Sequence, residues 1–416
     1  MQILKTAFFD KEKNAYFKPG VFIISKGMSM KNICIITGAF NDYQILKPLM
    51  IELKKDESTY STVISTGKHH TDDFVITHLR LEEEGFTMDE KTHITFNLQN
   101  TYGKTDSINF EQLEYDRLLK QLKPDIVVLI GSRYETFSAA IAATLNNIPI
   151  AHIQGGESEF RTWEDSYGYG ITKLSHLHFT STEKYRQQVL RFGEHSERVF
   201  NVGSLVIEKI KTLPLRGKAP FFNKIGINEE DKFIFISFHP DPAIGSKNGN
   251  LFQELLSSLT DERLAMYKLI FNKPEPIGLG KMIIQMMDDF ALKTTTQTVL
   301  LPFMDLPDLS CAIKYCSVVL GNTAESQIIA TSFKTPVINI GKRLQDRTRA
   351  LNIIDCPSTK QEILCAIQNG LSASFKGSVK DMSSPFEQVS PARKIKDILK
   401  EYTRTDIRQK SFYSPG

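Results

Sequence analysis

Short apolar runs alternate with longer amphipathic segments along most of the chain. The first complete unit begins at Lys31 with the strand-like run KNICIITG, continues through a helical segment at 39–56, and ends in a second run, STVISTGKHH. Short β-branched runs joined by amphipathic segments predict a parallel sheet with helices on both faces. The alternation continues at residues 124–131, 136–147, 149–156 and 177–193. We therefore predict one doubly wound domain over residues 31–205.

A second domain with the same alternation follows. The loose stretch LPLRGKAPFFNK precedes the strand-like run KFIFISFHPDP, which starts at residue 232. Further strand-like and helical segments predict a second doubly wound domain over residues 206–385, and a basic amphipathic helix begins near Pro391. The tail at 386–416 is a candidate to pack back on the first domain. Residues 1–30 form an N-terminal extension to which the sequence assigns no function.

Composition limits the classes of protein to consider. The 416 residues exceed one ordinary core and suit two domains. The chain is 41% hydrophobic and 24% charged, and no apolar run approaches the roughly 20 residues that cross a bilayer. A formal charge of +3, from 51 basic and 48 acidic residues, is too balanced for a nucleic-acid footprint. We expect a soluble protein without a membrane or nucleic-acid partner.

The five cysteines carry no sign of a disulfide framework or a metal site. They are scattered, without a CxxC pair or the histidine spacing of a zinc site. The first twenty residues lack the apolar region and cleavage site of a signal peptide. These features predict free thiols, a cytoplasmic location and no metal or other cofactor. The sequence leaves open whether the chain forms a homodimer.

Polar residues that follow strands are the candidate site residues, because α/β proteins bind ligands at the carboxyl ends of their parallel strands. Two doubly wound domains would place both of these edges against one interdomain cleft. In the segment 152–173, His152, Glu157, Glu164 and Asp165 gather around a Gly-Gly pair after a strand. Paired carboxylates can divide acid and base roles between them. A polar surface loop is an equally good interpretation of this segment alone.

Two further candidates lie in the second domain. His239 follows the strand KFIFI, where an imidazole can orient a phosphate or transfer a proton, although a histidine that stabilises the turn is the simpler interpretation. In the segment VVLGNTAESQIIA a polar turn leads into a helix, whose free N–H groups can bind a phosphate. Thr323 or Ser326 could instead be a simple N-cap.

A basic loop, GKRLQDRTR, follows the strand PVINIG and contains Arg343 and Arg347. Guanidinium groups suit a diphosphate because their fork matches two oxygens at once, whereas a solvated basic loop is the alternative. The chain has no GxGxxG after its first strand and no GxxxxGK[ST]. These absences argue against a dinucleotide dehydrogenase and a P-loop enzyme.

Taken in order, several stretches between Lys31 and Pro357 resemble the hydrolysing UDP-N-acetylglucosamine 2-epimerases of sialic and legionaminic acid synthesis. The stretches are ITGAFNDY, STGKHH, GSRYETFSAAIAATLNNIPIAHIQGGE, ITKLSHLHFTSTEKY, VFNVGSL, FHP, VLGNT and VINIGKRLQDRTR. The resemblance implies a GT-B-like fold of two Rossmann-like lobes, with the nucleotide held mainly by the C-terminal lobe. It also implies a UDP-activated amino sugar as substrate, which loses its C2 proton and UDP and then gains water with inversion at C2.

The resemblance also implies roles for individual residues. Its catalytic positions fall on Glu157, Glu164 and His239. Its nucleotide-binding positions fall on Asn322, Thr323, Ser326, Arg343 and Arg347, and its sugar-binding positions on Arg133, His152 and Asp165. No metal or other cofactor is implied.

The chain departs from the family pattern at several of these positions. Ala39 and Phe40 replace Ser-Arg, Ser132 replaces an Asp, Gln154 replaces a His, Gly168 and Tyr169 replace Arg-His, Ser326 replaces a Gly and Ile329 replaces the ribose-binding Glu. The changes affect base, phosphate and ribose contacts together. Two alternatives therefore accompany the epimerase prediction. One is a glycosyltransferase or epimerase that uses a different nucleotide sugar, and the other is a catalytically degenerate sensor or partner protein.

Overall fold

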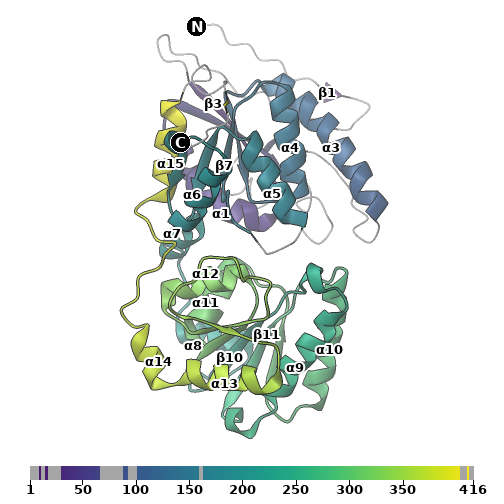
Figure 1. Ribbon diagram of the computed structural model, residues 1–416, viewed down its shortest axis with the longest axis vertical. Coiled ribbons are helices and arrows are strands. Elements are labelled where there is room, and N and C mark those ends of the chain that lie inside the picture. The colour runs from purple at the N-terminus through teal and green to yellow at the C-terminus, as the bar shows by residue number, and fades with distance from the viewer. Residues whose placement is uncertain are drawn as a thin grey trace.

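Two parallel sheets form the centres of two lobes that are stacked along the long axis of the molecule (Figure 1). The computed structural model describes residues 9–10, 15–16, 30–65, 88–91, 101–158, 163–402 and 410–411. A small antiparallel pair, β1 (Phe9–Asp10) and β2 (Ala15–Tyr16), precedes the first lobe. Among the described residues, no helix is both long and apolar enough to cross a membrane.

The N-terminal lobe contains, in the described part of the chain, a seven-stranded sheet in the order β5-β4-β3-β6-β7-β8-β9 with parallel pairing throughout. Every residue of β6 is buried, as expected for a central strand covered on both faces. The strands are β3 (Lys31–Thr37), β4 (Thr59–Ser65), β5 (Met88–Lys91), β6 (Ile126–Ile130), β7 (Ile150–Ile153), β8 (Leu177–Thr180) and β9 (Val199–Asn201). The helices are α1 (Phe40–Lys55), α3 (Thr101–Leu122), α4 (Tyr134–Leu145), α5 (Trp163–Leu174) and α6 (Glu183–Arg191), with the short 3-10 turn η3 (Ser196–Arg198).

The C-terminal lobe repeats this plan with a sheet of six described strands in the order β12-β11-β10-β13-β14-β15, again parallel. The strands are β10 (Lys232–Ser237), β11 (Tyr267–Asn272), β12 (Thr298–Leu301), β13 (Val318–Gly321), β14 (Val337–Ile340) and β15 (Ile353–Cys356). The helices are α8 (Lys218–Ile225), α9 (Lys247–Leu259), α10 (Leu279–Lys293), α11 (Leu306–Tyr315), α12 (Ala324–Phe333), α13 (Lys360–Leu371) and α14 (Ala373–Ser378), with the 3-10 turns η4 (Pro242–Ile244) and η5 (Glu262–Leu264). The predicted α/β fold class is confirmed.

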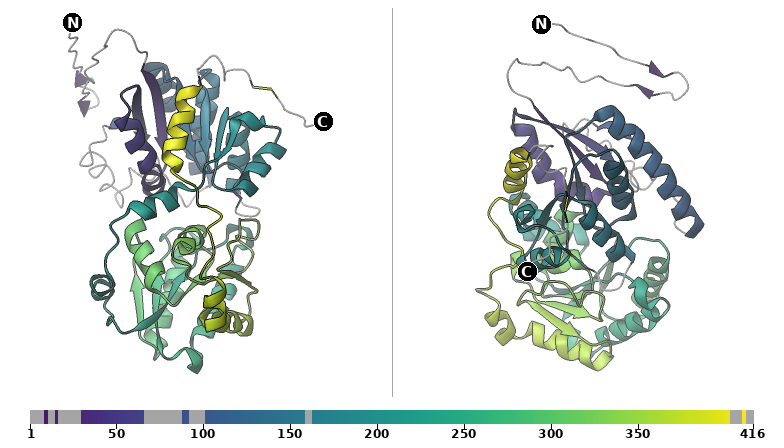
Figure 2. Two further views of the ribbon diagram at one scale, coloured as in Figure 1. Left: turned by 90° about the vertical axis from the view of Figure 1, so that its left-hand side faces the viewer. Right: turned by 45° about the horizontal axis from the view of Figure 1, so that its top comes forward.

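The chain crosses between the lobes twice. Helix α7 (Leu205–Thr212) leads into the C-terminal lobe and packs on α1 and α12. After α14 the chain returns, so that α15 (Pro391–Glu401) lies against α1 of the N-terminal lobe (Figure 2). Ala392, Ile395 and Leu399 of α15 are fully buried in the core of that lobe. The division into domains at residues 205 and 385 stays a prediction.

One glycine allows the central strands of the C-terminal lobe to meet closely at their carboxyl ends. Gly321 pairs with Ser237 in the β10–β13 ladder and has φ +148. A Cβ on Gly321 would lie only 1.8 Å from the Ser237 carbonyl oxygen. Any side chain here would force the two strands apart. The close approach brings the turn after β13 beside the turn after β10, where the candidate residues begin.

Candidate active site

A cavity of about 270 Å³ lies between the two lobes at the carboxyl ends of their strands. Its walls come from the segments after β6 and β7, from α5 and α12, and from the turns after β10 and β14. The predicted site residues that line it are Arg133, His152, Glu157, Asp165, His239, Thr323, Ser326, Arg343 and Arg347. Glu164 belongs to the first turn of α5, but its side chain lies outside the described residues.

Glu157 and Arg347 form an ion pair across the cleft, from opposite lobes. Their side chains are 11% and 9% exposed, so each charge depends on the other for compensation. Ser181, which follows β8, donates a hydrogen bond of 2.6 Å to the second carboxylate oxygen of Glu157. A catalytic candidate and a diphosphate-binding candidate thus neutralise each other in this structure.

The loop that carries Arg347 is fastened to the N-terminus of α6. Lys184 donates to the carbonyl oxygens of Asp346 at 2.7 Å and Arg347 at 3.3 Å. The Thr348 N–H donates to the Tyr185 hydroxyl at 3.0 Å. These contacts fix the backbone around Arg347 while its side chain reaches into the cavity.

His239 is held by its backbone. The Asn322 Oδ1 accepts from the His239 N–H at 2.8 Å, and Asn322 Nδ2 donates to the His239 carbonyl oxygen at 2.9 Å. Because both ends of the Asn322 amide are engaged and the residue is only 1% exposed, this side chain orients His239. In this structure the Asn322 side chain binds the His239 backbone through both of its polar atoms, and its predicted place in the nucleotide-binding region stays a prediction.

The N-terminus of α12 points into the cavity. Its N-cap residue, Thr323, makes no side-chain cap and instead donates to the Ser237 hydroxyl at 3.2 Å, so the simple N-cap alternative does not hold for it. Ser326 lines the cavity, is 2% exposed, and its Oγ has no hydrogen-bond partner among the residues that the structure describes. A helix N-terminus with an unsatisfied hydroxyl is suited to an anionic ligand such as a phosphate.

His152 is a structural support at the cavity wall. Its Nε2 lies 2.8 Å from the Gly131 carbonyl oxygen, to which it must donate, and its Nδ1 lies 3.2 Å from the Thr172 hydroxyl. Burial lowers the pKa of His152 to about 3. A ring that is neutral and engaged at both nitrogens joins β6, β7 and α5. It is poorly suited to proton transfer near neutral pH.

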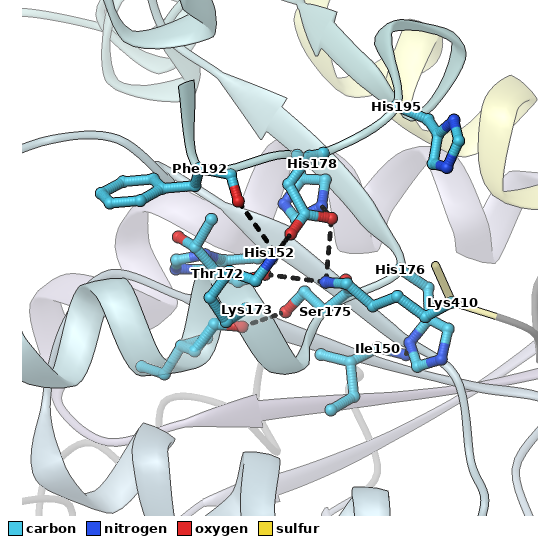
Figure 3. Close-up of polar contacts among 12 residues, drawn as sticks. Ile150, His152, Thr172, Lys173, Ser175, His176, His178, Phe192, His195 and Lys410 are labelled. Carbon is cyan, nitrogen blue, oxygen red and sulfur yellow. Dashed lines mark hydrogen bonds and ion pairs between the residues drawn. The ribbon is translucent and has the colours of Figure 1, made fainter. Parts of the chain in front are cut away.

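The far end of α5 is held by the C-terminal segment (Figure 3). Lys410 lies against the Ser175 and Thr172 carbonyl oxygens and 2.9 Å from Glu194, a favourable place for a cation at a helix C-terminus. Burial opposes ionisation of Glu194, yet hydrogen bonds from His178 and from the lysines hold its pKa at about 2. Because α5 carries cavity residues at its other end, this network supports the site from behind.

Arg133 and the residues behind it form a second charged layer. Arg133 lies 3.1 Å from Asp42, and this carboxylate raises the pKa of the guanidinium, which stays charged. Behind it, burial and then the neighbouring Glu135 raise the pKa of Glu111 to about 9. Glu111 is therefore a neutral acid at physiological pH. Neither Glu111 nor Glu135, both of which are buried, was predicted from the sequence to support the site.

Three of the departures from the family pattern, Ser132, Gln154 and Gly168, lie together on the N-terminal wall. Ser132 and Gly168 line the cavity, and a Cβ on Gly168 would lie 3.0 Å from the Ser132 Cβ. A side chain at residue 168 would require the Ser132 side chain to move by a few tenths of an ångström. Tyr169 is partly exposed and contacts the Phe192 ring at 5.1 Å between centroids. Gln154 lines the cavity, and the Phe40 side chain lies outside the described residues.

Two residues of the C-terminal lobe change the expected site. Glu325 was not predicted from the sequence, and Ile329 is apolar where the family pattern has a Glu. Glu325, in the first turn of α12, lines the cavity, and an acidic residue directly after GNTA was the signal for it. Ile329 is fully buried in the apolar core of its lobe. That position contributes packing and cannot hydrogen-bond to a ribose.

Comparison with known proteins decides the family. A model of the family described as UDP-N-acetylglucosamine 2-epimerase matches residues 51–400. The chain belongs to the UDP-N-acetylglucosamine 2-epimerase family. Within this family it is 30% identical to the GDP/UDP-N,N'-diacetylbacillosamine 2-epimerase (hydrolyzing) of Campylobacter jejuni, over 79% of this chain and 85% of that protein. It is 29% identical to the polysialic acid biosynthesis protein P7 of Escherichia coli, over 92% of this chain and 97% of that protein.

Solved structures share the fold of this epimerase family member. The UDP-GlcNAc 2-epimerase of Neisseria meningitidis, solved with UDP-GlcNAc bound, superposes with a TM-score of 0.76 at 18% sequence identity and covers 90% of this chain and 100% of its own. The resemblance found in the sequence and the GT-B-like architecture are thereby confirmed. The roles of the individual site residues stay predictions.

Proposed function

We propose that the protein is a hydrolysing nucleotide-sugar 2-epimerase that acts on a UDP-activated amino sugar. The observation that carries the proposal is the interdomain cavity, which Glu157 and His239 line together with the N-terminus of α12 and the arginines Arg133, Arg343 and Arg347. Proton-transfer groups and diphosphate-binding groups are the two requirements of an elimination that expels a nucleotide. Family membership and the names of the relatives support the same reaction.

The reaction has two balanced steps. Removal of the C2 proton sends the C–H electron pair into a C1=C2 double bond while the C1–O bond breaks and its electrons leave with the diphosphate. Water then adds its hydroxyl to C1, and C2 receives a proton on the opposite face. The products are UDP and the free 2-epimeric sugar.

The Glu157–Arg347 ion pair couples binding to this chemistry. In the structure Arg347 holds Glu157, but a diphosphate offers a guanidinium two oxygens at once and competes for it. Glu157 that has lost its ion-pair partner is available to accept the C2 proton of the sugar. Substrate binding would thus release the catalytic carboxylate at the moment it is needed. His239, fixed by Asn322, is the second proton-transfer candidate.

Two measurements test the proposal. Melting shifts with UDP, GDP and CMP should show selectivity for UDP, since a ligand at 100 times its Kd adds about 2.7 kcal/mol of stability. Incubation with UDP-N-acetylglucosamine or a UDP-diacetamido sugar should release UDP and the free 2-epimer in equal amounts. Transfer of the sugar to an acceptor would instead support the glycosyltransferase alternative. No melting shift with any nucleotide would support the sensor.

A further inference from the structure

A carboxylic acid stands where the proposed function needs an anion-binding site. Glu325 lies in the first turn of α12, beside Ser326, and its side chain lines the cavity. The free N–H groups of that turn and the unsatisfied Ser326 hydroxyl are the features that suit a diphosphate. An ionised carboxylate at the same place would repel the diphosphate. Binding is favourable only if Glu325 is neutral.

The surroundings of Glu325 favour its neutral form. Burial, and then the charge of Asp42 across the cleft on α1, raise its pKa to about 7. The positive N-terminal end of the α12 dipole lowers the pKa of Glu325, but this effect is smaller than the upward shift that burial and Asp42 cause. The other charged or titratable side chains of the cavity wall are Arg133, His152, Glu157, Asp165, His239, Arg343 and Arg347. Near neutral pH, Glu325 therefore exchanges readily between the acid and the carboxylate.

We propose that Glu325 binds the substrate as a neutral acid and donates its proton to the β-phosphate oxygen that leaves the sugar. As the C1–O bond breaks, its electron pair goes to that oxygen, which takes the proton from the Glu325 O–H. The departing UDP carries the proton, and Glu325 is left as a carboxylate. The new negative charge beside the diphosphate promotes release of UDP, and solvent returns the proton. The inference rests on the proposed function and adds a catalytic residue to it.

UDP binding to the full-length protein, measured by calorimetry from pH 6 to 8.5, tests the proposal. The variants are Glu325→Gln, which keeps a hydrogen-bond donor but cannot ionise, and the control Glu229→Gln, the same change on the exposed surface of the C-terminal lobe. We expect affinity of the wild type and the control to fall above pH 7, by up to about tenfold per pH unit, relative to Glu325→Gln. At pH 6 the three proteins should agree within a few-fold. The ratio of the wild-type affinity to the Glu325→Gln affinity cancels the titration of UDP itself.

The possible outcomes separate the two proposals. Equal pH dependence in all proteins, with UDP bound throughout, would overturn the role of Glu325 and leave the proposed function intact. Absence of UDP binding to any protein would overturn both. Turnover gives a second readout, because Glu325→Gln should bind UDP well at pH 8 yet release it more slowly from substrate than the wild type. Should Glu325→Gln fail to fold by circular dichroism, Glu325→Ala replaces it, and its UDP affinity should likewise vary less with pH above 7 than that of the wild type.

Discussion

The two walls of the cleft are built from different interactions. On the C-terminal wall, neutral hydrogen bonds join the turns after neighbouring strands, as in the Asn322 clamp on His239 and the bond from Thr323 to Ser237. On the N-terminal wall, buried ionisable groups support the site, among them His152 with a pKa of about 3 and Glu111 with a pKa of about 9. The departures from the family pattern at Ser132 and Gly168 lie on this second wall.

The two walls should therefore respond differently to pH. Hydrogen bonds between neutral groups keep their strength across the physiological pH range, so the C-terminal wall should present His239 and the α12 N-terminus in one fixed arrangement, while the charge of Glu325 on that wall changes near neutral pH. The N-terminal wall depends on which of its buried groups carry protons, and its stability should vary with pH. The ion pair between Glu157 and Arg347 is where the two walls meet.

The largest effect on turnover should come from removing the ion pair between Glu157 and Arg347. Glu157→Gln keeps the shape of the side chain but removes the carboxylate, and a positioned acid or base contributes about 10²- to 10⁴-fold to a rate. We expect turnover to fall by that factor while UDP affinity is retained or rises, because the diphosphate no longer competes with the Glu157 carboxylate for Arg347. Release of UDP and calorimetric titration with UDP measure the two quantities.

Ser181→Ala is the matched control for this variant. It removes the 2.6 Å hydrogen bond to Glu157 but leaves the carboxylate and its ion pair. Its turnover should fall by less than about tenfold, the size of one lost hydrogen bond. A Glu157→Gln protein that is as active as Ser181→Ala would contradict a catalytic role for Glu157.

The next largest effect should come from the C-terminal wall. Asn322→Ala removes both hydrogen bonds to the partly buried backbone N–H and C=O groups of His239. We expect a loss of about 2–4 kcal/mol in the free energy of unfolding. Turnover should also fall by roughly 10- to 100-fold, because His239 would no longer be held in the position that proton transfer needs. Urea denaturation and UDP release measure the two effects.

A double variant tests whether Asn322 acts through His239. If it does, Asn322→Ala should reduce the turnover of a His239→Ala protein by far less than it reduces that of the wild type, since residues that act as a unit are not additive. Fully additive losses would show that Asn322 affects the reaction in another way.

The sequence predicted the elements and the edge of the sheets where the site lies, because strand and helix patterns are local. The sequence also predicted that Glu157, His239 and Arg347, which all follow strands, lie at one cleft, and all three line the cavity. Contacts that depend on strand order could not be predicted. Whether Asn322 points into the cavity or clamps a neighbouring turn follows from the pairing of β10 with β13, 80 or so residues apart in the chain.

The same limit applies to the supports behind the N-terminal wall. Lys410 at the end of α5 and the buried Glu111 behind Arg133 come from segments distant in sequence, and neither belongs to a recognisable motif. Glu325 was visible as an acidic residue after GNTA, but its importance depends on Asp42 from the other lobe. Charge partners across a cleft are set by how the lobes dock.

A smaller effect is expected from restoring the family carboxylate on the N-terminal wall. Ser132→Asp adds bulk and charge in a turn that Gly168 approaches closely, so it should not raise turnover of UDP-N-acetylglucosamine and should lower it by up to about tenfold. Ser132→Asn, of equal size and without charge, separates crowding from electrostatics. Higher UDP release by Ser132→Asp than by the wild type would show instead that the site is an ordinary one weakened only by the missing carboxylate.

The smallest effect concerns the pH dependence of stability on the N-terminal wall. His176 accepts a hydrogen bond from the Ile150 N–H at 3.2 Å, and burial, with Lys410 and Arg198 nearby, lowers its pKa from 6.5 to about 4. The unfolded chain therefore takes up a proton first, so stability that is present above pH 6.5 is lost as the pH falls toward 4. The slope for one such group is about 1 kcal/mol per pH unit. We expect His176→Gln to reduce the slope of the unfolding free energy between pH 6.5 and 4 by about that amount, as measured by urea denaturation. His152 and His178, whose pKa values burial also lowers, add slope of the same sign, whereas Glu111 and Glu325, whose pKa values are raised, add slope of the opposite sign above pH 4.5. An identical slope in the wild type and in His176→Gln would show that folding does not lower the pKa of His176.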